Sequence, residues 1–256
     1  MSHPISEGIV AAWLFNEQGV GGLSQTRQLE DSATKAWPCS VTLTAGDILR
    51  GYSDIGVGIS LPGNVNAYLT PGALPLDSSH WTIICRLTRP TASAASVSFR
   101  YVAWGGGGPT IWSAGSGNFG IVHTGTVDLS ASEGPPAGGV PHVLAITRSN
   151  ARARMYRDAR KIASSDAFAV SYSQDSDFRI GSSTAFGEPV PGVFDYVYAW
   201  RRGLTESEIT ELFLNPYGHY TAPRSARMFF GFAAAGGGGF QAAWAVGANQ
   251  RGRIFA

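Results

Sequence analysis

Short segments with the composition of β-strands follow one another along most of this 256-residue chain. They are rich in Val, Ile, Thr and aromatic residues, and Gly, Pro, Ser, Asn or Asp bounds each of them, which is typical of strands in an antiparallel fold. Because such segments must bury one face against another layer, they predict a two-sheet antiparallel sandwich. The predicted strands cover residues 8–15, 57–62, 67–70, 80–89, 96–104, 118–124, 142–148, 153–158 and 193–202.

Two of these segments alternate clearly between apolar and other residues, which predicts strands with two distinct faces. Within 80–89, one face should carry Trp81, Ile83, Cys85 and Leu87, and the other Thr82, Arg86 and Thr88. Within 193–202, one face should carry Phe194, Tyr196 and Tyr198, and the other Val193, Asp195 and Val197. Asp195 lies in mid-strand, so we expect its carboxylate to be buried against backbone N–H groups or an arginine.

One helix is predicted, over residues 204–216. Thr205 and Glu208 have the spacing of a capping box, and Leu204 can pack on Ile209 as a hydrophobic staple. A single late helix behind many strands supports an all-β fold. The buried stripe of the helix should contain Ile209, Leu212 and Phe213.

The composition excludes several classes of protein. The formal net charge of +1 argues against a nucleic-acid binder, which needs a strongly basic face. No apolar run approaches the ~20 residues of a membrane span. Cys39 and Cys85 are too few for a disulfide scaffold and predict two small buried side chains. The first residues, MSHPISEGIVAAWLF, lack an export signal, so we expect folding and assembly in a cytoplasm.

The composition changes after Pro216, where apolar patches alternate with glycine and alanine without sustained periodicity. We therefore expect one domain over residues 1–216 and an extended Gly/aromatic arm over 217–256. Exposed aromatic residues invite association, so the arm should dock on a partner through aromatic and arginine anchors. These anchors are Arg224, Arg227, Phe229, Phe230, Phe240, Trp244, Arg251, Arg253 and Phe255.

Three stretches together resemble laminin-G-like, concanavalin A-type jelly-roll domains. They are GISLPGNVNAYLTPGALPLDSSHWTIICRLTR, HVLAITRSNARARMYRDARKIASS and DFRIGSSTAFGEPVPGVFDYVYAWRRGLTESEITELF, and the resemblance covers residues 7–216. It implies a concanavalin A-like jelly roll with a short C-terminal helix. The hairpin turns Asn150-Ala151 and Asp158-Ala159 depart from the family, which favours glycine second for its positive φ.

No arrangement of residues predicts catalysis. Related glycoside hydrolases need two carboxylates that flank the scissile bond, spaced Glu-x-Asp-x-x-Glu on one strand, and that spacing does not occur. Glu206, Glu208 and Glu211 suit the N-terminal dipole of the helix instead. His142 opens a strand and is expected to form hydrogen bonds at the rim of the sandwich. We therefore expect no enzyme and no required cofactor.

A calcium ion is the one metal that the resemblance suggests, because laminin-G-like domains often hold one at a loop rim. Oxygen ligands suit Ca²⁺. The alternative is that the same Asp and Asn residues bond their own backbone in turns. The candidate ligands are Asp175, Asp177, Asn64 and Asn66.

A carbohydrate site is predicted where aromatic rings can stack on sugar faces. Tyr101, Trp104 and Trp112 flank the glycine-rich residues 105–108. The alternative is that these rings belong to the core, which is the usual place for large aromatic side chains.

Two functions compete. Ala222-Pro223-Arg224 and residues 243–250, AWAVGANQ, resemble termini of structural proteins of tailed bacteriophages. With the expected assembly in a host cytoplasm, this predicts a virion protein, a capsid decoration or fibre component. Its partners would be capsid or tail proteins and further copies of itself, such as a trimer. The alternative is an adhesion or carbohydrate-binding module of a bacterial surface or secreted protein, with a surface glycan as ligand and no nucleic acid or membrane partner.

Overall fold

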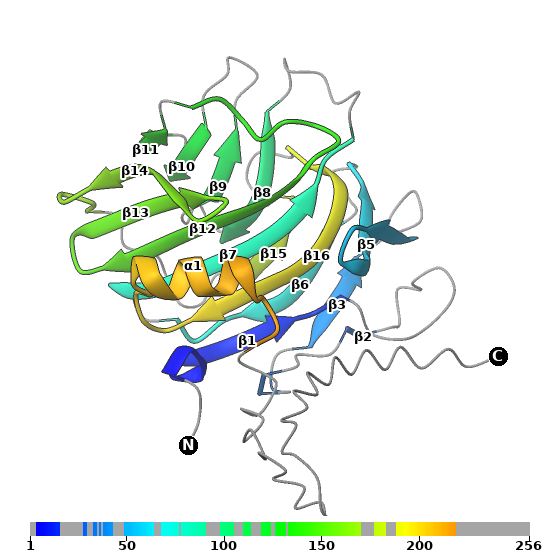
Figure 1. Ribbon diagram of the computed structural model, residues 1–256, viewed down its shortest axis with the longest axis horizontal. Coiled ribbons are helices and arrows are strands. Elements are labelled where there is room, and N and C mark those ends of the chain that lie inside the picture. The colour runs from blue at the N-terminus through cyan, green and yellow to red at the C-terminus, as the bar shows by residue number, and fades with distance from the viewer. Residues whose placement is uncertain are drawn as a thin grey trace, which may run out of the picture. The chain divides into compact units, whose positions relative to one another are not determined.

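A computed structural model shows two antiparallel β-sheets packed face to face, with one short helix on the outside of the first sheet (Figure 1). This confirms the predicted all-β jelly-roll sandwich. The structure describes residues 4–15, 28–29, 33–34, 36, 38–42, 49–63, 68–76, 78–90, 98–104, 110–113, 119–123, 126–131, 133–169, 177–182 and 188–218. Of Gln28–Leu29, Cys39–Thr42, Leu49–Ser53, Trp104, His123 and 126–128 it describes the backbone alone.

Sheet A, the sheet that carries the helix, has the strand order β14-β13-β12-β7-β16-β5-β4, with β1 paired to β16. Its long central strands, β7 and β16, pair over most of their length. The bounds are β14 (Arg160–Ser165), β13 (Arg152–Arg157), β12 (Pro141–Ser149), β7 (His80–Thr88), β16 (Pro191–Trp200), β5 (Gly56–Pro62), β4 (Leu49–Ser53) and β1 (Ile9–Trp13).

Sheet B lies behind sheet A in Figure 1 and has the order β11-β10-β9-β8-β15-β6-β3-β2. Strands β15 and β8 pair although three strands of sheet A, β12, β13 and β14, lie between them in sequence. The bounds are β11 (Thr126–Ala131), β10 (Phe119–His123), β9 (Thr110–Ser113), β8 (Phe99–Trp104), β15 (Asp177–Ile180), β6 (Tyr68–Ala73), β3 (Cys39–Thr42) and β2 (Gln28–Leu29).

The main core fills the space between the two sheets. The inward face of β7 carries Trp81, Ile83, Cys85 and Leu87, all buried there, which confirms the predicted alternation. Trp13 of sheet A stacks on Phe178 of sheet B, with ring centroids 5.8 Å apart. Aromatic pairs of this kind add to the stabilisation from burial and hold the two layers in register. Burial raises the pKa of the Cys85 thiol, so this cysteine is an inert core residue.

A β-bulge in β16 overturns part of the predicted alternation there. The register shifts between Phe194 and Tyr196, so Phe194 packs between the sheets while Tyr196 and Tyr198 pack on the outside of sheet A. The expectation that the three rings share a face is therefore wrong, because one extra residue reverses the side-chain phase. Asp195 lies at the bulge and its carboxylate accepts a hydrogen bond from Arg86, as expected of this residue.

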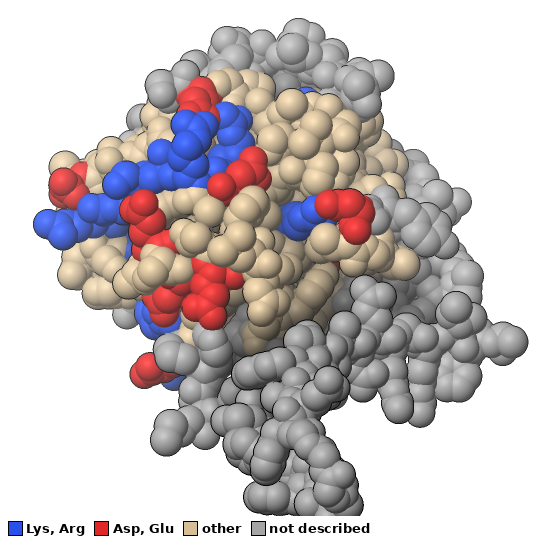
Figure 2. Space-filling model, viewed as in Figure 1, with Lys and Arg blue, Asp and Glu red and all other residues tan. Residues whose placement is uncertain are grey.

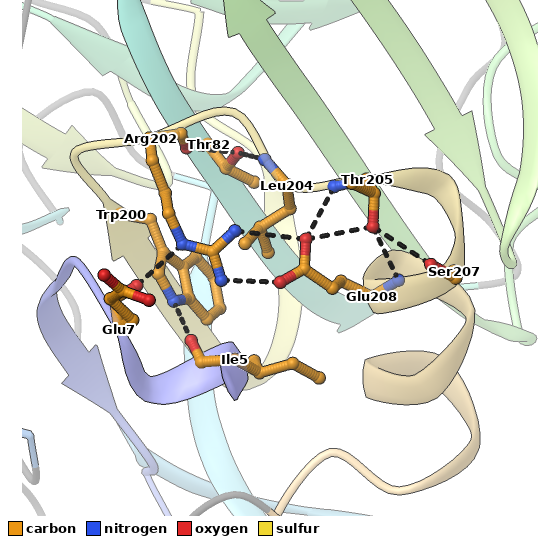
Figure 3. Close-up of polar contacts among 9 residues, drawn as sticks. All are labelled: Ile5, Glu7, Thr82, Trp200, Arg202, Leu204, Thr205, Ser207 and Glu208. Carbon is orange, nitrogen blue, oxygen red and sulfur yellow. Dashed lines mark hydrogen bonds and ion pairs between the residues drawn. The ribbon is translucent and has the colours of Figure 1, made fainter. Parts of the chain in front are cut away.

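The helix α1 (Glu206–Leu214) begins with the predicted capping box. The Thr205 hydroxyl accepts from the Glu208 amide at 3.3 Å, and the Glu208 carboxylate accepts from the Thr205 amide at 2.8 Å (Figure 3). Arg202 then donates to both oxygens of Glu208, at 2.6 and 3.1 Å. Thr82 joins the segment to β7, since its hydroxyl accepts from the Leu204 amide at 2.8 Å. The start of the helix is thus tied to the central strand of sheet A.

A second apolar cluster seals α1 and the N-terminal 3₁₀ turn (Pro4–Ser6) onto the outside of sheet A. Trp200 is fully buried in it, and its Nε1 donates to the Ile5 carbonyl at 2.8 Å (Figure 3). Ile209 and Leu212 are buried as predicted, but Phe213 is 38% exposed. The predicted burial of Phe213 is therefore wrong: Ile209 and Leu212 suffice to cover the sheet below the helix.

The chain returns to sheet A after α1. The Tyr198 hydroxyl donates to the Pro216 carbonyl at 2.8 Å, and the Tyr217 ring meets the Tyr196 ring edge-on at 6.3 Å. Tyr217, which the sequence placed at the start of the arm, thus packs on the sandwich. Residues 219–256 of the predicted arm, with all of its anchors, lie outside the described residues.

Two hairpin turns of sheet A carry positive φ at residues other than glycine. They are at Asn150 (55°), Asp158 (52°) and Ala159 (64°). The turn between β13 and β14 therefore has the type I′ form that the twist of a hairpin favours, with alanine where glycine is normal. Alanine in this region costs about 1–2 kcal/mol.

Candidate functional site

The outer face of sheet B gathers aromatic and arginine side chains at its centre. Leu69, Phe178 and Ile180 are fully buried between the sheets, so the alternating neighbours Tyr68 and Arg179 lie on the opposite side. By the same alternation, Trp112 lies opposite the buried Ile111 in β9, and Arg100 opposite the buried Phe99 in β8. We call Tyr68, Arg100, Trp112, Arg179 and Glu188 the aromatic–arginine face.

Arg179 and Tyr68 form the first pair on this face. The Arg179 guanidinium carbon lies 4.0 Å from the centroid of the Tyr68 ring, across the paired strands β15 and β6. Both side chains are half-buried. Within the described part of the chain, the Arg179 side chain forms no ion pair besides this stacking, and its Nε is buried without an acceptor.

Arg100 and Trp112 form the second pair. They face each other across β8 and β9, with the guanidinium carbon 5.6 Å from the indole centroid. Arg100 also pairs with the Glu188 carboxylate, and its amide donates to the Glu188 carbonyl at 2.9 Å. Burial lowers the pKa of Arg100, and Glu188 opposes that shift, so the guanidinium stays charged. Trp112 is half-buried, and its Nε1–H has no acceptor among the described residues.

The two pairs lie on neighbouring strands of one sheet face. The strands that carry them are neighbours in the order β9-β8-β15-β6, so Trp112 and Tyr68 are separated by three strand spacings, ~14 Å. Ala103 pairs in register with both Thr110 and Arg179; Ala103 and Thr110 are buried, as is Arg100. The partly exposed rings of Trp112 and Tyr68 can each stack on a flat face of an extended ligand, while Arg179 and Glu188 supply hydrogen bonds.

The family model Laminin_G_3, which describes the concanavalin A-like lectin/glucanases superfamily, matches residues 62–210. This chain belongs to that superfamily. The matched residues include both arginine–aromatic pairs and run to the middle of α1. No curated protein sequence matches the chain significantly.

Solved structures show the same fold at low sequence identity. Domain 4 of AbnA, an extracellular arabinanase from Geobacillus stearothermophilus solved in complex with arabinotriose, has 18% identity and a TM-score of 0.56, with 80% of this chain and 97% of that chain covered. The binding domain of Paraclostridial Mosquitocidal Protein 1 has 13% identity and a TM-score of 0.60, with 84% and 53% covered. A sialidase from Trypanosoma rangeli has 14% identity and a TM-score of 0.58, and the match spans 34% of that chain. The jelly roll is thus comparable to the whole of the first and to a part of the other two.

Of the three rings predicted to bind sugar, this lectin-like fold brings Trp112 to the outer face. Tyr101 is fully buried between the sheets, where its hydroxyl lies 3.0 Å from Ser113 Oγ. The expected ligand role of Tyr101 is therefore corrected: a bulge in β8 next to Arg100 turns Tyr101 and Val102 both toward the core. Trp104 ends β8, and its side chain lies outside the described residues.

The predicted calcium ligands do not form a site in the described residues. Asp177 is exposed at the start of β15, while Asn64, Asn66 and Asp175 lie outside the described residues. No group of three His, Cys, Asp or Glu side chains placed to hold a metal occurs in the described part. Calcium binding therefore stays a prediction.

His142 forms a hydrogen bond at the rim of the sandwich, as predicted. Its Nδ1 lies 2.7 Å from Asp158, which also accepts from the Val143 amide at 2.9 Å. Burial would raise the pKa of Asp158, but these two hydrogen bonds outweigh it and lower that pKa. Asp158 is also the first residue of the strained β13–β14 turn, so its hydrogen bonds with His142 and Val143 stabilise the hairpin.

The basic side chains of β13 and β14 are paired with acidic ones. Figure 2 shows basic side chains gathered in a band over β13 and β14, with acidic side chains beside them. Each of five basic residues there has an acidic partner: Arg152 and Arg154 at Asp166, Arg157 and Arg160 at Glu133, and Lys161 at Glu206. Exposed pairs of this kind contribute little to stability and leave little net charge for a partner. No helix in the described part of the chain has the length and apolar character of a membrane span.

Sequence reasoning missed most of the aromatic–arginine face. Arg179 lies in DFRI and Tyr68 in AYLT, two short strands that pair only in the folded chain. The alternation of Asp177 and Arg179 with Phe178 and Ile180 was a signal for an outward arginine. Its tyrosine partner could not be found without the order of the strands.

Proposed function

We propose that this domain is a non-catalytic carbohydrate-binding module, and that it binds its ligand on the aromatic–arginine face of sheet B. The observation that carries the proposal is the placement of Trp112 and Tyr68, two half-buried rings each stacked on an arginine, on the outer face of the same sheet. Membership of a lectin and glucanase superfamily supports a saccharide as ligand. So does the likeness to an arabinanase domain solved with a bound arabinotriose.

The chemistry of the face favours binding over hydrolysis. Hydrolysis of a glycosidic bond needs one carboxylic acid with a raised pKa and a second carboxylate near it. On this face Glu188 forms an ion pair with Arg100, and Asp177 is exposed. Stacking and hydrogen bonding need neither metal nor cofactor, so we propose that none is required.

A glycan array followed by calorimetry with any hit tests the proposal. Trp112→Ala should weaken binding about tenfold or more, because a ring that stacks on a sugar is removed. Phe213→Ala is the matched control, since it deletes an exposed ring on the other side of the sandwich. Equal losses in both variants, or a Trp112→Ala protein that binds as the wild type does, would exclude this face as the site. Release of shorter sugars from the bound glycan would refute a non-catalytic role.

A virion role stays a prediction from the sequence. The comparisons favour the adhesion or carbohydrate-binding alternative, and the arm that motivated the virion role lies outside the described residues. Truncation after Gly218 keeps the contacts of Pro216 and Tyr217 with sheet A. Loss of incorporation into particles, with glycan binding retained, would support a virion role for the arm. Normal incorporation of the truncated chain would refute it.

A further inference from the structure

Arg179 differs from the other arginines around it because nothing in the described protein balances its charge. Arg100 has Glu188, and the arginines of β13 and β14 have Glu133 and Asp166. Arg201 also lacks an acidic partner among the described residues, but it is exposed, where water solvates the charge. Arg179 is half-buried on the sheet, where water solvates it less well.

The stack on Tyr68 holds this charge in place. A guanidinium 4.0 Å from a ring centroid gains cation–π attraction and loses freedom to swing away. The Nε is buried and Tyr68 covers one face of the group, so the two terminal nitrogens, which are not buried, are the atoms that a ligand can reach. A guanidinium fixed in this way can donate two parallel hydrogen bonds to an anionic group. Such charge-assisted hydrogen bonds are stronger than those between neutral groups.

We propose that the saccharide bound by the aromatic–arginine face carries an anionic group, a carboxylate or a sulfate, which pairs with the guanidinium of Arg179. This inference rests on the proposed function. Trp112 would stack on a sugar ring near the other end of the ligand, since the two side chains lie two strand spacings apart, ~10 Å across the sheet. The ligand is therefore longer than one sugar.

Two carboxylates lie near the site, and an unpaired one should weaken the binding of an anionic ligand. Glu188 is held by Arg100. Asp177 lies two residues before Arg179 on the same face of β15, is exposed, and forms no ion pair with it. Asp177 therefore repels an anionic ligand weakly, and Asp177→Asn should strengthen binding of that ligand about twofold at low salt. A purely structural role for Arg179 predicts no such gain.

The test compares matched saccharides that differ only in charge. Oligogalacturonate is measured against its methyl ester, and a sulfated galactan fragment against its desulfated form, by calorimetry at low and high salt. We expect at least one charged member to bind about tenfold or more tightly than its neutral counterpart, and more weakly at high salt. Arg179→Gln should remove that preference, Arg179→Lys should retain part of it, and Arg201→Gln, with the same loss of charge elsewhere, should retain it fully.

The possible outcomes separate the inference from the proposed function. If neutral glycans bind as well as charged ones and Arg179→Gln changes nothing, the inference is wrong, while loss of binding in Trp112→Ala still supports the proposed function. If the folded protein binds no saccharide, the proposed function fails and the inference fails with it. If Arg179→Gln does not fold, the affinity of Asp177→Asn for the charged glycan provides the test. Stronger binding supports the inference, and unchanged or weaker binding overturns it.

Discussion

The two outer faces of the sandwich have the same alternating strands but different surroundings. On sheet A, α1 and the N-terminal turn cover Trp200, whose Nε1 donates to the Ile5 carbonyl at 2.8 Å. On sheet B, Trp112 is half-buried, and its Nε1 has no acceptor in the described part of the chain. A fully buried indole whose polar atom is satisfied by its own chain stabilises the fold, whereas a partly exposed indole leaves ring surface on which a ligand can stack.

The arginines of the two faces differ in the same way. On the sheet A side, Arg202 binds both oxygens of Glu208, and Arg86 binds Asp195 and both oxygens of Asp54. On sheet B, Arg179 stacks on a tyrosine ring and pairs with no carboxylate among the residues that the structure describes. The arginines on the sheet A side therefore form ion pairs that stabilise the fold, whereas Arg179 on sheet B is left to interact with a ligand.

The largest effect is expected from Trp200→Ala. The substitution removes a fully buried ring and the bond to Ile5, and should lower the free energy of unfolding by about 3–5 kcal/mol. Urea denaturation followed by circular dichroism measures this loss. A loss below about 1 kcal/mol would show that α1 and the N-terminal turn are not sealed onto sheet A as the structure has them.

Tyr68→Ala should act on binding instead. Loss of the cation–π contact frees Arg179 and should weaken saccharide binding by the equivalent of about 0.5–2 kcal/mol, with little change in stability. Tyr68→Phe keeps the ring and should bind as the wild type does, which separates ring stacking from hydrogen bonding by the hydroxyl. Calorimetry with the glycan identified on the array gives both values. A large loss of stability with unchanged binding would show that Tyr68 is a structural residue and that the outer faces of sheets A and B do not differ in function.

Glu208→Gln tests the sheet A side through its pH dependence. Burial raises the pKa of Glu208, but the bonds from Arg202 and Thr205 outweigh it and hold that pKa below its ordinary value. A carboxylate with a lowered folded pKa adds stability above its unfolded pKa of about 4.3, and this is lost as the pH falls through the folded pKa. The free energy of unfolding of the variant should therefore be lower by about 1 kcal/mol at pH 7, and this difference from the wild type should disappear below pH ~4.

Urea denaturation at several pH values measures this gap. Glu206→Gln is the control, because its pair with Lys161 is exposed and should contribute well under 1 kcal/mol. If the difference in the free energy of unfolding between the wild type and Glu208→Gln does not change with pH, the charge of Glu208 does not contribute to the capping box.

The sequence predicted the fold where local chemistry decides the structure. Residues 80–89 alternate so regularly that β7 could be placed with its buried face, and Thr205 with Glu208 marked the start of α1. It did not predict edge strands such as β14, whose sequence RKIASS is half polar and pairs only with β13. Nor could it predict the bulge at Asp195, because a one-residue shift depends on pairing with β7.

The site was less accessible from the sequence than the fold. Trp112 was singled out because it flanks a glycine-rich stretch, but Tyr101, from the same cluster, is a core residue. The pairs that define the surface join β6 to β15 and β8 to β9, and the first of these links residues more than a hundred positions apart. Such contacts follow from the topology of the sandwich, which no local pattern encodes.

The smallest effect is expected from Ala159→Gly, in the hairpin at the edge of sheet A. Ala159 has φ 64°, a conformation that glycine adopts without strain, so the variant should be more stable by about 0.5–1 kcal/mol. Ala151→Gly is the matched control: Ala151 follows Asn150 in the other turn but is not among the residues with positive φ, so it should gain nothing and lose a few tenths of a kcal/mol. Thermal denaturation measures both. Since the turn belongs to sheet A, saccharide affinity should be unchanged in Ala159→Gly, and a change of several-fold would show that the two faces are coupled rather than separate in function.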